Sequence, residues 1–493
     1  MHGHHRRLVG LALLLLGLSA VWRLAPAAMH AREHQRAGPG VPDTLLMAQW
    51  PRPAGSARQF LTQRRLVALE PTSRAPRPLL DGAQPPVVSP DGRELYVVQD
   101  LDLGDVVRVD LVALTSDSLN RRWTANVATL PATALDQPNG TALFYLAVAA
   151  TSDSVYVGRL SRDSAPMEVV VLDRADGAER ARWQLDLGGP AASANLLADA
   201  DEGYLNVLAL DGNVFGPTSS PPLTVVRVRL ADGLEVARYR PQQAPTAGEF
   251  AWSGIPVAGG RALYKLSPNE GQPSTRVEFL DLAAGSVERL EVELAMPRAV
   301  EFGPREWGAS ADGLRLYVLS PLSGELAIVD LLQRRVLQKV SVGMPAPERA
   351  ADSPLADLWT AVRRLLAVSG ANAKVAFSQR LEVSPDERHL YGVAARSEGN
   401  GSSGDGVWAI DTQSWQVAAH WLGGREPVTL LLSADGQRLY VHEAQTDQSP
   451  GVLHVVETAS GLEAATVDGL ATGQLISVAE LYRSRYGHLL APD

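Results

Sequence analysis

Ser89-Pro90-Asp91-Gly92-Arg93-Glu94-Leu95-Tyr96-Val97 is the stretch that decides the fold, because the chain repeats it. Asp-Gly between apolar segments predicts a tight turn, since glycine adopts positive φ without steric cost. Leu-Tyr-Val after the turn predicts a strand, because aromatic and β-branched side chains suit a pleated surface. Near copies run from Ser310 to Val318, from Ser384 to Tyr391 and from Ser433 to Val441.

Including weaker copies, the repeat is marked along the chain by a series of tyrosines. They are Tyr96, Tyr156, Tyr204, Tyr264, Tyr317, Tyr391 and Tyr440. After each tyrosine strand, a second strand, a tight turn and a more polar strand follow, as in Val169 to Leu185. With the strand before the Asp-Gly turn, each copy predicts one four-stranded antiparallel sheet, which needs about 40–50 residues. Such sheets are amphipathic, and radial packing would bury their faces, so the sequence predicts an all-β fold, a β-propeller.

The phrase S-P/A-D-G-x-x-L-Y-V, followed by V-x-V-x-D and a glycine turn, resembles the bacterial YVTN-type propeller repeats. More distantly, it is similar to lactonase-like and WD40-like propellers, and to the quinoprotein amine dehydrogenase-like superfamily. The resemblance covers roughly residues 85–470. It implies the fold and says little about function, because this fold hosts many unrelated activities.

We expect the propeller to span residues 44–486, with seven complete blades. Residues 44–80 would supply part of an eighth, because Leu45–Trp50 and Arg65–Glu70 imitate the second and third strands of a blade. Leu475–Tyr482 would be the inner strand of that blade, so that the two ends of the chain close the ring. Alternatively, residues 44–80 add one outer strand to a seven-bladed ring.

The N-terminal segment, residues 1–28, has the pattern of a signal peptide or an N-terminal membrane anchor. Arg6 and Arg7 precede an apolar run from Leu8 to Trp22, and the small residues at 25–28 suit cleavage. The run is shorter than the roughly 20 residues of a typical membrane span. Both interpretations place the body outside the cytoplasm, either secreted or periplasmic, or anchored to the outer face of the cytoplasmic membrane. Residues 29–43 would be a linker.

One segment inside the predicted propeller, residues 351–369, has a different period. Ser353 can cap a helix, and Pro354 fits the first turn. The apolar residues that follow recur at three- and four-residue spacing: Leu355, Leu358, Trp359, Val362, Leu365, Leu366 and Val368. We therefore expect an inserted amphipathic helix that packs on one end of the ring.

Composition excludes several classes of function. The formal net charge of −10 argues against a nucleic-acid partner, which needs a basic face. The absence of cysteine excludes disulfides, thiol nucleophiles and cysteine-ligated zinc. A mean hydropathy of −0.04 excludes a multi-span membrane protein, so the membrane would be contacted only through the N-terminal segment.

The motifs of common enzymes are missing. Gly308–Asp312 approaches a nucleophile elbow but lacks the last glycine. No phosphate-binding or dinucleotide fingerprint occurs. Two sets of repeated aspartates are interpreted as turn residues rather than metal ligands. They are Asp91, Asp312, Asp386 and Asp435 in the turns of the repeated phrase, and Asp110, Asp173, Asp281, Asp330 and Asp411 at strand ends.

After His34, every histidine lies in the C-terminal part of the chain, from His389 onward. His442 and His454 lie on neighbouring predicted strands, where they could face each other and bind a metal with Glu443. Their spacing matches no established metal motif, which favours ordinary strand histidines. The sequence therefore predicts no catalytic, cofactor-binding or metal-binding residues and no cofactor.

These observations favour an extracytoplasmic, non-catalytic β-propeller scaffold that binds a protein, peptide or glycan at one face of the ring. The alternative is a lactonase-like or other hydrolase with an acid and arginine site at the channel mouth. A second alternative is a cell-surface structural protein.

Overall fold

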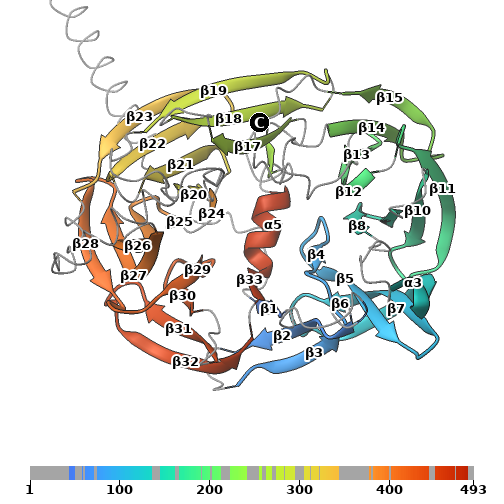
Figure 1. Cartoon of the computed structure of the whole chain (residues 1–493), viewed down its shortest axis with the longest axis horizontal. Coiled ribbons are helices and arrows are strands. Elements are labelled where there is room, and N and C mark those ends of the chain that lie inside the picture. Colours follow the sequence, from blue (N-terminus) through green and yellow to red (C-terminus); the bar gives the residue numbers. More distant parts are fainter. Residues whose placement is uncertain are drawn as a thin grey trace, which may run out of the picture. The chain divides into compact units, whose positions relative to one another are not determined.

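In the computed structural model, the described strands form eight sheets arranged as a ring within residues 41–493 (Figure 1). The structure describes residues 44–49, 58, 62–70, 75–135, 145–160, 166–189, 191–199, 202–211, 223–240, 255–257, 262–268, 274–282, 284–294, 305–310, 313–320, 323–343, 377–378, 381–398, 401–443, 450–471 and 473–486. The predicted all-β propeller is confirmed. We number its sheets as blades I to VIII in chain order.

Blades II to V each contain four antiparallel strands, which run in chain order from the channel outward. Blade II consists of β4 (Val87–Val88), β5 (Glu94–Asp102), β6 (Val106–Thr115) and β7 (Arg121–Pro131). Blade III consists of β8 (Tyr145–Ala150), β9 (Ser154–Leu160), β10 (Pro166–Asp173) and β11 (Glu179–Asp186). Blade IV consists of β12 (Ala191–Asp199), β13 (Tyr204–Asp211), β14 (Leu223–Arg229) and β15 (Glu235–Tyr239). Blade V consists of β16 (Ile255–Val257), β17 (Ala262–Pro268), β18 (Ser274–Asp281) and β19 (Val287–Glu293).

Blades VI to VIII follow the same plan. Blade VI consists of β20 (Arg305–Ala309), β21 (Arg315–Ser320), β22 (Glu325–Asp330) and β23 (Arg335–Ser341), with β24 (Phe377–Ser378) added in parallel beside β20. Blade VII consists of β25 (Leu381–Val383), β26 (His389–Glu398), β27 (Gly401–Asp411) and β28 (Gln416–Trp421). Blade VIII consists of β29 (Pro427–Leu432), β30 (Arg438–Glu443), β31 (Gly451–Glu457) and β32 (Glu463–Leu470).

Blade I is built from both ends of the chain. Its inner strand is β33 (Gly473–Ser477), and its outer strands are β1 (Leu45–Gln49), β2 (Arg65–Leu69) and β3 (Arg77–Asp81). β1 and β33 pair antiparallel from Leu45 opposite Ser477 to Gln49 opposite Gly473. Of the two ring-closure alternatives, the structure therefore has the eighth blade, closed by the N- and C-terminal strands.

The prediction that Leu475–Tyr482 forms one strand is partly wrong. The strand ends at Ser477, and helix α5 (Val478–Tyr486) follows. The Ser477 hydroxyl accepts a hydrogen bond from the backbone N–H of Glu480 at 3.2 Å, as in the Ser-x-x-Glu box that begins helices. In the sequence, the apolar residues after this cap resemble a continuation of the strand.

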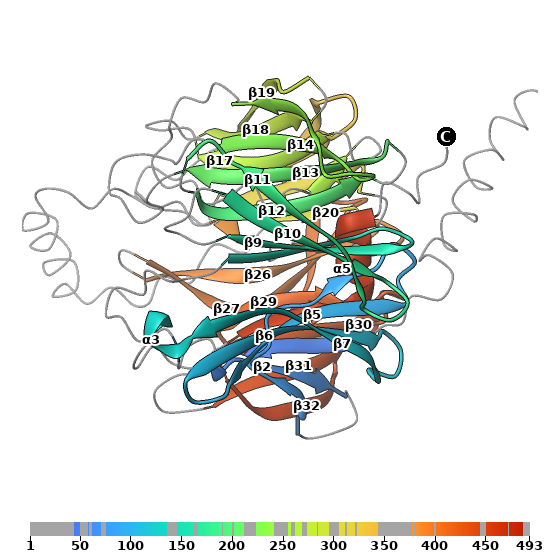
Figure 2. The same ribbon diagram turned by 90° about the vertical axis from the view of Figure 1, so that its right-hand side faces the viewer.

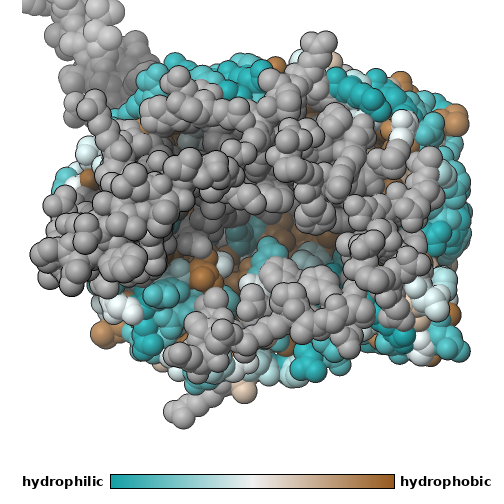
Figure 3. All heavy atoms as spheres, viewed as in Figure 1, coloured by the Kyte–Doolittle hydropathy of each residue, from teal (hydrophilic) through white to brown (hydrophobic). Residues whose placement is uncertain are grey.

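The helices lie at the ends of the ring. α5 crosses near the axis at one end and contacts β4, β16 and β33, and the short α3 (Ala132–Leu135) lies at the other end (Figure 2). Figure 3, in the view of Figure 1, shows mostly hydrophilic residues along the described outer edge and some hydrophobic residues nearer the centre. No helix among the described residues is long and apolar enough to cross a membrane. The predicted signal or anchor (1–28), linker (29–43) and inserted helix (351–369) lie outside the described residues.

The hydrophobic core is divided among the junctions between neighbouring blades. One buried cluster joins blades I and II and includes Leu46, Leu66, Leu95 and Ile476. Similar clusters occupy the seven other junctions of the described chain. Each blade thus buries its apolar face against the next, as the amphipathic strands require.

The Asp-Gly repeat forms the predicted turn. Ser89 donates to Asp91 at 2.7 Å and accepts from the backbone N–H of Glu94 at 2.9 Å. Blades VII and VIII repeat both bonds at Ser384 and Ser433. Of the strand-closing aspartates, Asp173, Asp281, Asp330 and Asp411 accept backbone N–H groups of the following turns.

Asp110 does not close a strand, contrary to the prediction. It lies within β6, is buried, and accepts hydrogen bonds from Arg108 at 3.0 Å and Asn126 at 3.2 Å. β6 continues to Thr115 because Leu111 to Leu114 extend its apolar pattern beyond the aspartate.

We predict that Leu46→Ala weakens the closure of the ring. Leu46 is fully buried on β1, so its loss leaves a cavity between blades I and II and should cost about 2–5 kcal/mol of unfolding free energy. Leu103→Ala, at a leucine that is 56% exposed, should change that free energy by less than about 0.5 kcal/mol. Chemical denaturation of both variants checks this, and equal effects would contradict the closure.

Candidate functional site

The first hairpin of blade II carries a buried carboxylate. Glu94, at the start of β5, is 1% exposed. It accepts a hydrogen bond from the Tyr96 hydroxyl at 2.6 Å and forms an ion pair with Arg122. A charge removed from water needs such partners, because its burial is otherwise costly.

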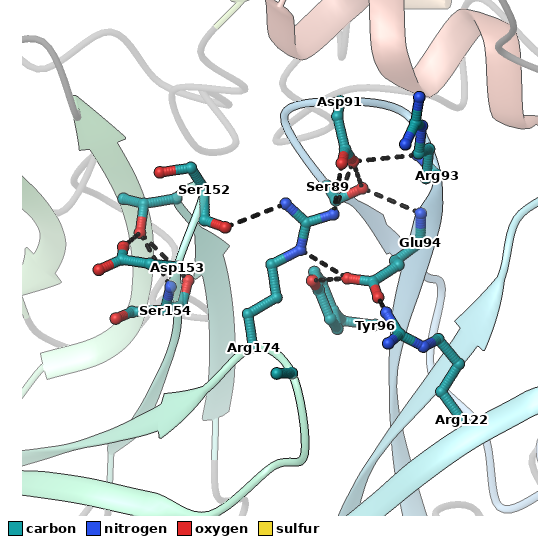
Figure 4. Close-up of polar contacts among 12 residues, drawn as sticks. Ser89, Asp91, Arg93, Glu94, Tyr96, Arg122, Ser152, Asp153, Ser154 and Arg174 are labelled. Atoms are coloured by element: carbon teal, nitrogen blue, oxygen red, sulfur yellow. Dashed lines mark hydrogen bonds and ion pairs between the residues drawn. The ribbon is translucent and has the colours of Figure 1, made fainter.

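The neighbouring blade supplies a second arginine to this carboxylate. Arg174 follows β10 of blade III, and its Nε lies 2.6 Å from Glu94 Oε2 (Figure 4). Its Nη2 lies 2.7 Å from both carboxylate oxygens of Asp91, and its Nη1 donates to the Ser152 carbonyl at 3.2 Å. One guanidinium therefore joins blades II and III.

The two charges support each other. Burial alone would lower the pKa of Arg174, but the hydrogen bond to Asp91 and the nearby negative charges outweigh it and raise that pKa. Burial would likewise raise the pKa of Asp91, but hydrogen bonds from Arg174 and Ser89 outweigh it and lower that pKa. The cluster is a neutralised link between blades rather than a reactive acid.

Arg174 departs from the internal repeat. Its backbone N–H donates to the carbonyl of Asp153 in its own first hairpin, and this bond identifies the same position in other blades. The equivalent residues are Ser116, Leu230, Leu331, Thr412 and Thr458. The arginine in blade III is a signal that the sequence analysis missed and that aligning the repeats would have revealed.

Aromatic side chains cover the same junctions from outside. The Trp123 indole of blade II lies against Gly177 of blade III, where an added Cβ would meet the ring at 2.6 Å. Trp183 of blade III lies in the same way against Gly233 of blade IV. Both glycines have positive φ, so the turn and the aromatic contact each favour glycine.

A cavity of about 740 Å³ opens at the junction of blades III and IV. Its lining includes Tyr156, Trp183 and Leu230 and residues of the first hairpins of the two blades. These hairpins lie at the same end of the ring as α5. The reason is that α5 follows the C-terminal end of the inner strand β33, and the inner strands of the other blades turn into their second strands at that same end. Leu230 stands at the position of Arg174, and Ser154 at that of Glu94.

Asp153 and Arg180 form the blade III side of this cavity. The Asp153 side chain is 70% exposed; it accepts from Thr151 at 2.9 Å and lies 3.4 Å from Arg180. Arg180 is bound more closely to Asp173, at 2.7 Å, and donates to Ser154 at 2.9 Å. The Asp153 carboxylate therefore remains largely open to the cavity.

The blade IV side adds Glu202, Tyr204 and Arg229. Glu202 is paired with Arg227, whose guanidinium lies 4.1 Å from the centre of the Tyr204 ring. Arg229 is paired with Asp232. The wall thus combines an acid, a cation and an aromatic face within one pocket.

The chemistry of the pocket suits recognition. Neither histidine nor cysteine is among its lining residues, so a Ser–His or Cys–His nucleophile is not assembled there. Burial raises the pKa of Tyr156, which keeps its hydroxyl protonated. The lining offers hydroxyls, aromatic faces and fixed charges, which orient a bound group.

His442 and His454 do not meet, contrary to the geometry considered for a metal. His454 is opposite Val441 and His442 is opposite Leu453, so the two side chains point to opposite faces of the sheet. His454 lies 3.0 Å from Glu443 and 3.2 Å from Glu463, and His442 is fully buried with neither ring nitrogen hydrogen-bonded. No group of three His, Cys, Asp or Glu among the described residues could hold a metal ion.

Comparisons with known proteins support no family assignment. No family model and no curated protein matches the chain. Among solved structures, it is similar to the dihydro-haem d1 dehydrogenase NirN, with 16% identity, 90% of this chain and 76% of that chain covered, and a TM-score of 0.46. A proposed 6-phosphogluconolactonase from Bacteroides uniformis is 14% identical over 88% of this chain and 100% of that chain, with a TM-score of 0.34.

A third similar structure is AztD from Citrobacter koseri, 9% identical over 88% of this chain and 97% of that chain, with a TM-score of 0.39. At these identities and TM-scores, the likeness carries no argument about activity. The resemblance of the repeat to YVTN-type propellers stays a prediction.

We predict that Arg174→Leu destabilises the protein by about 3 kcal/mol, because Glu94 would stay buried without its second cation. Arg65→Leu removes an exposed arginine that is also ion-paired, and should cost less than about 1 kcal/mol. Urea denaturation of the two variants measures the difference. Similar losses in both would show that the link between blades II and III contributes little.

His442 should make the protein sensitive to acid. Burial lowers its pKa from 6.5 to about 4. Between these pH values the unfolded chain binds a proton that the folded protein does not, so stability falls as pH decreases, by at most about 1.4 kcal/mol per pH unit. His442→Leu should remove this part of the pH dependence, and His420→Gln, at an exposed histidine, should retain it. Denaturation curves at pH 7.5, 6 and 5 test the prediction, which fails if His442→Leu keeps the wild-type slope.

Proposed function

We propose that this protein is a β-propeller binding module whose ligand site is the pocket between blades III and IV. The observation that carries the proposal is the cavity of about 740 Å³ at a junction where the arginine of the preceding junction is replaced by Leu230. Cavities of roughly 300–1,000 Å³ with aromatic faces and a few polar groups are typical of ligand sites. The ligand is a small polar group, either free or part of a larger partner.

The charges at this end of the ring favour binding over hydrolysis. A lactonase-like enzyme would need acids and arginines free to act at the channel mouth. Here Asp91 and Glu94 are neutralised by Arg174, whose side chain is 14% exposed, together with Arg122. α5 also crosses near the axis at this end. These features support a scaffold more than they support a hydrolase.

The rest of the proposal comes from the sequence. The N-terminal segment predicts export, so the partner would be met outside the cytoplasm. An extracytoplasmic protein, peptide or glycan remains the expected class, and the pocket gives that class a site on the ring.

A blocked pocket tests the proposal. Ala231 lines the pocket and is exposed, so Ala231→Trp should close the pocket. The control is Ala175→Trp, which makes the same change at the equivalent turn of blade III, beside the junction that Arg174 fills. Saturation-transfer NMR with a panel of tripeptides and trisaccharides should detect probes that bind the wild type and Ala175→Trp but not Ala231→Trp.

Two results would contradict the proposal. One is a panel in which Ala231→Trp changes no binding. The other is that the wild type hydrolyses glucono-δ-lactone and Ala231→Trp abolishes this activity. The pocket would then be an enzyme's active site.

A further inference from the structure

The junction of blades II and III shows how this chain holds a guanidinium. Arg174 binds the Asp91 carboxylate. Its Nη2 lies 2.7 Å from each of the two carboxylate oxygens. The Tyr96 and Trp123 rings stand together beside it, with centroids 6.0 Å apart. The Trp123 Nε1 donates to the Arg174 carbonyl at 2.9 Å, which fixes the backbone that carries the guanidinium.

The junction of blades III and IV repeats most of this framework. Thr151 donates to Asp153 as Ser89 donates to Asp91, at 2.9 and 2.7 Å. Tyr156 and Trp183 form the corresponding ring pair, with centroids 5.8 Å apart.

Two side chains differ between the junctions. Leu230 takes the position of Arg174, so blade IV sends no cation to Asp153 from that position. Ser154 takes the position of Glu94, which removes the deeper carboxylate. The cavity between blades III and IV therefore lies where the corresponding arginine would be.

One carboxylate of the cavity is placed to receive a cation. Asp153 and Glu202 line the cavity together with Arg180 and Arg229, so the lining is neutral overall, but these charges are not equally paired with one another. Asp153 is the more exposed of the two carboxylates. An incoming cation would meet it without displacing a close partner, because Arg180 is 3.4 Å away and is held by Asp173.

We propose that the pocket binds the arginine side chain of a peptide partner, with its guanidinium on Asp153 and its plane against the aromatic rings of the lining, Tyr156 and Trp183. This inference rests on the proposed function and names its ligand. A guanidinium fits better than an ammonium, because its planar group both forks onto a carboxylate and stacks on aromatic rings. Arg227 over the Tyr204 ring is an example of such stacking in this chain.

The test compares three peptides by isothermal titration calorimetry: N-acetyl-Gly-Arg-Gly-amide and its lysine and citrulline counterparts. The wild type should bind the arginine peptide at least tenfold more tightly than either counterpart. Asp153→Asn should weaken that binding at least tenfold, since Asp153 is exposed and its substitution spares the core. Leu230→Arg should abolish binding by filling the pocket from within, and Leu230→Met is its matched control and should bind as the wild type does.

The outcomes separate the two proposals. If the arginine peptide fails to bind while another probe still binds in a way that Ala231→Trp blocks, the ligand class is wrong and the binding module stands. If the arginine peptide binds equally to the wild type, Asp153→Asn and Leu230→Arg, this pocket is not its site. If neither the peptides nor the probe panel bind, both proposals fall.

Discussion

The structure depends on one constraint: every sheet has apolar faces that only a neighbouring sheet can cover. The repeated turn and strand produce such sheets, and the pairing of β1 with β33 closes them into a ring. Without that pairing, blades I, II and VIII would expose the apolar residues that now form the clusters on either side of blade I. Ring closure therefore gives every junction the same kind of interface, in which the apolar faces of two sheets pack together. The side chains at equivalent positions of different junctions can then be compared.

Those differences are where function can arise. The repeat supplies a turn carboxylate, a buried tyrosine and an outer aromatic residue at the junction of blades II and III and again at the junction of blades III and IV. In the first, Arg174 completes the set and links the blades. In the second, Leu230 leaves it incomplete, and a cavity results. Two positions of the repeat, those of Arg174 and Glu94, thus separate a structural link from the proposed ligand site.

Much of the fold was predictable, because turns and strands are encoded locally by Asp-Gly and by alternating apolar residues. Short-range signals also mislead: the apolar residues after Ser477 predict a strand although they follow a helix cap, and Asp110 predicts a strand end although β6 continues. The site could not be predicted in this way. Asp91 and Arg174 are 83 residues apart, and the pocket depends on what is missing between two blades.

The most direct test of the account is a crystal structure of the double variant Ser154→Glu, Leu230→Arg, which gives the junction of blades III and IV the side chains of the junction of blades II and III. The account predicts that the introduced guanidinium lies on Asp153 and the introduced carboxylate, as Arg174 lies on Asp91 and Glu94, and that the cavity disappears. An introduced arginine that extends into solvent above an open cavity would contradict it.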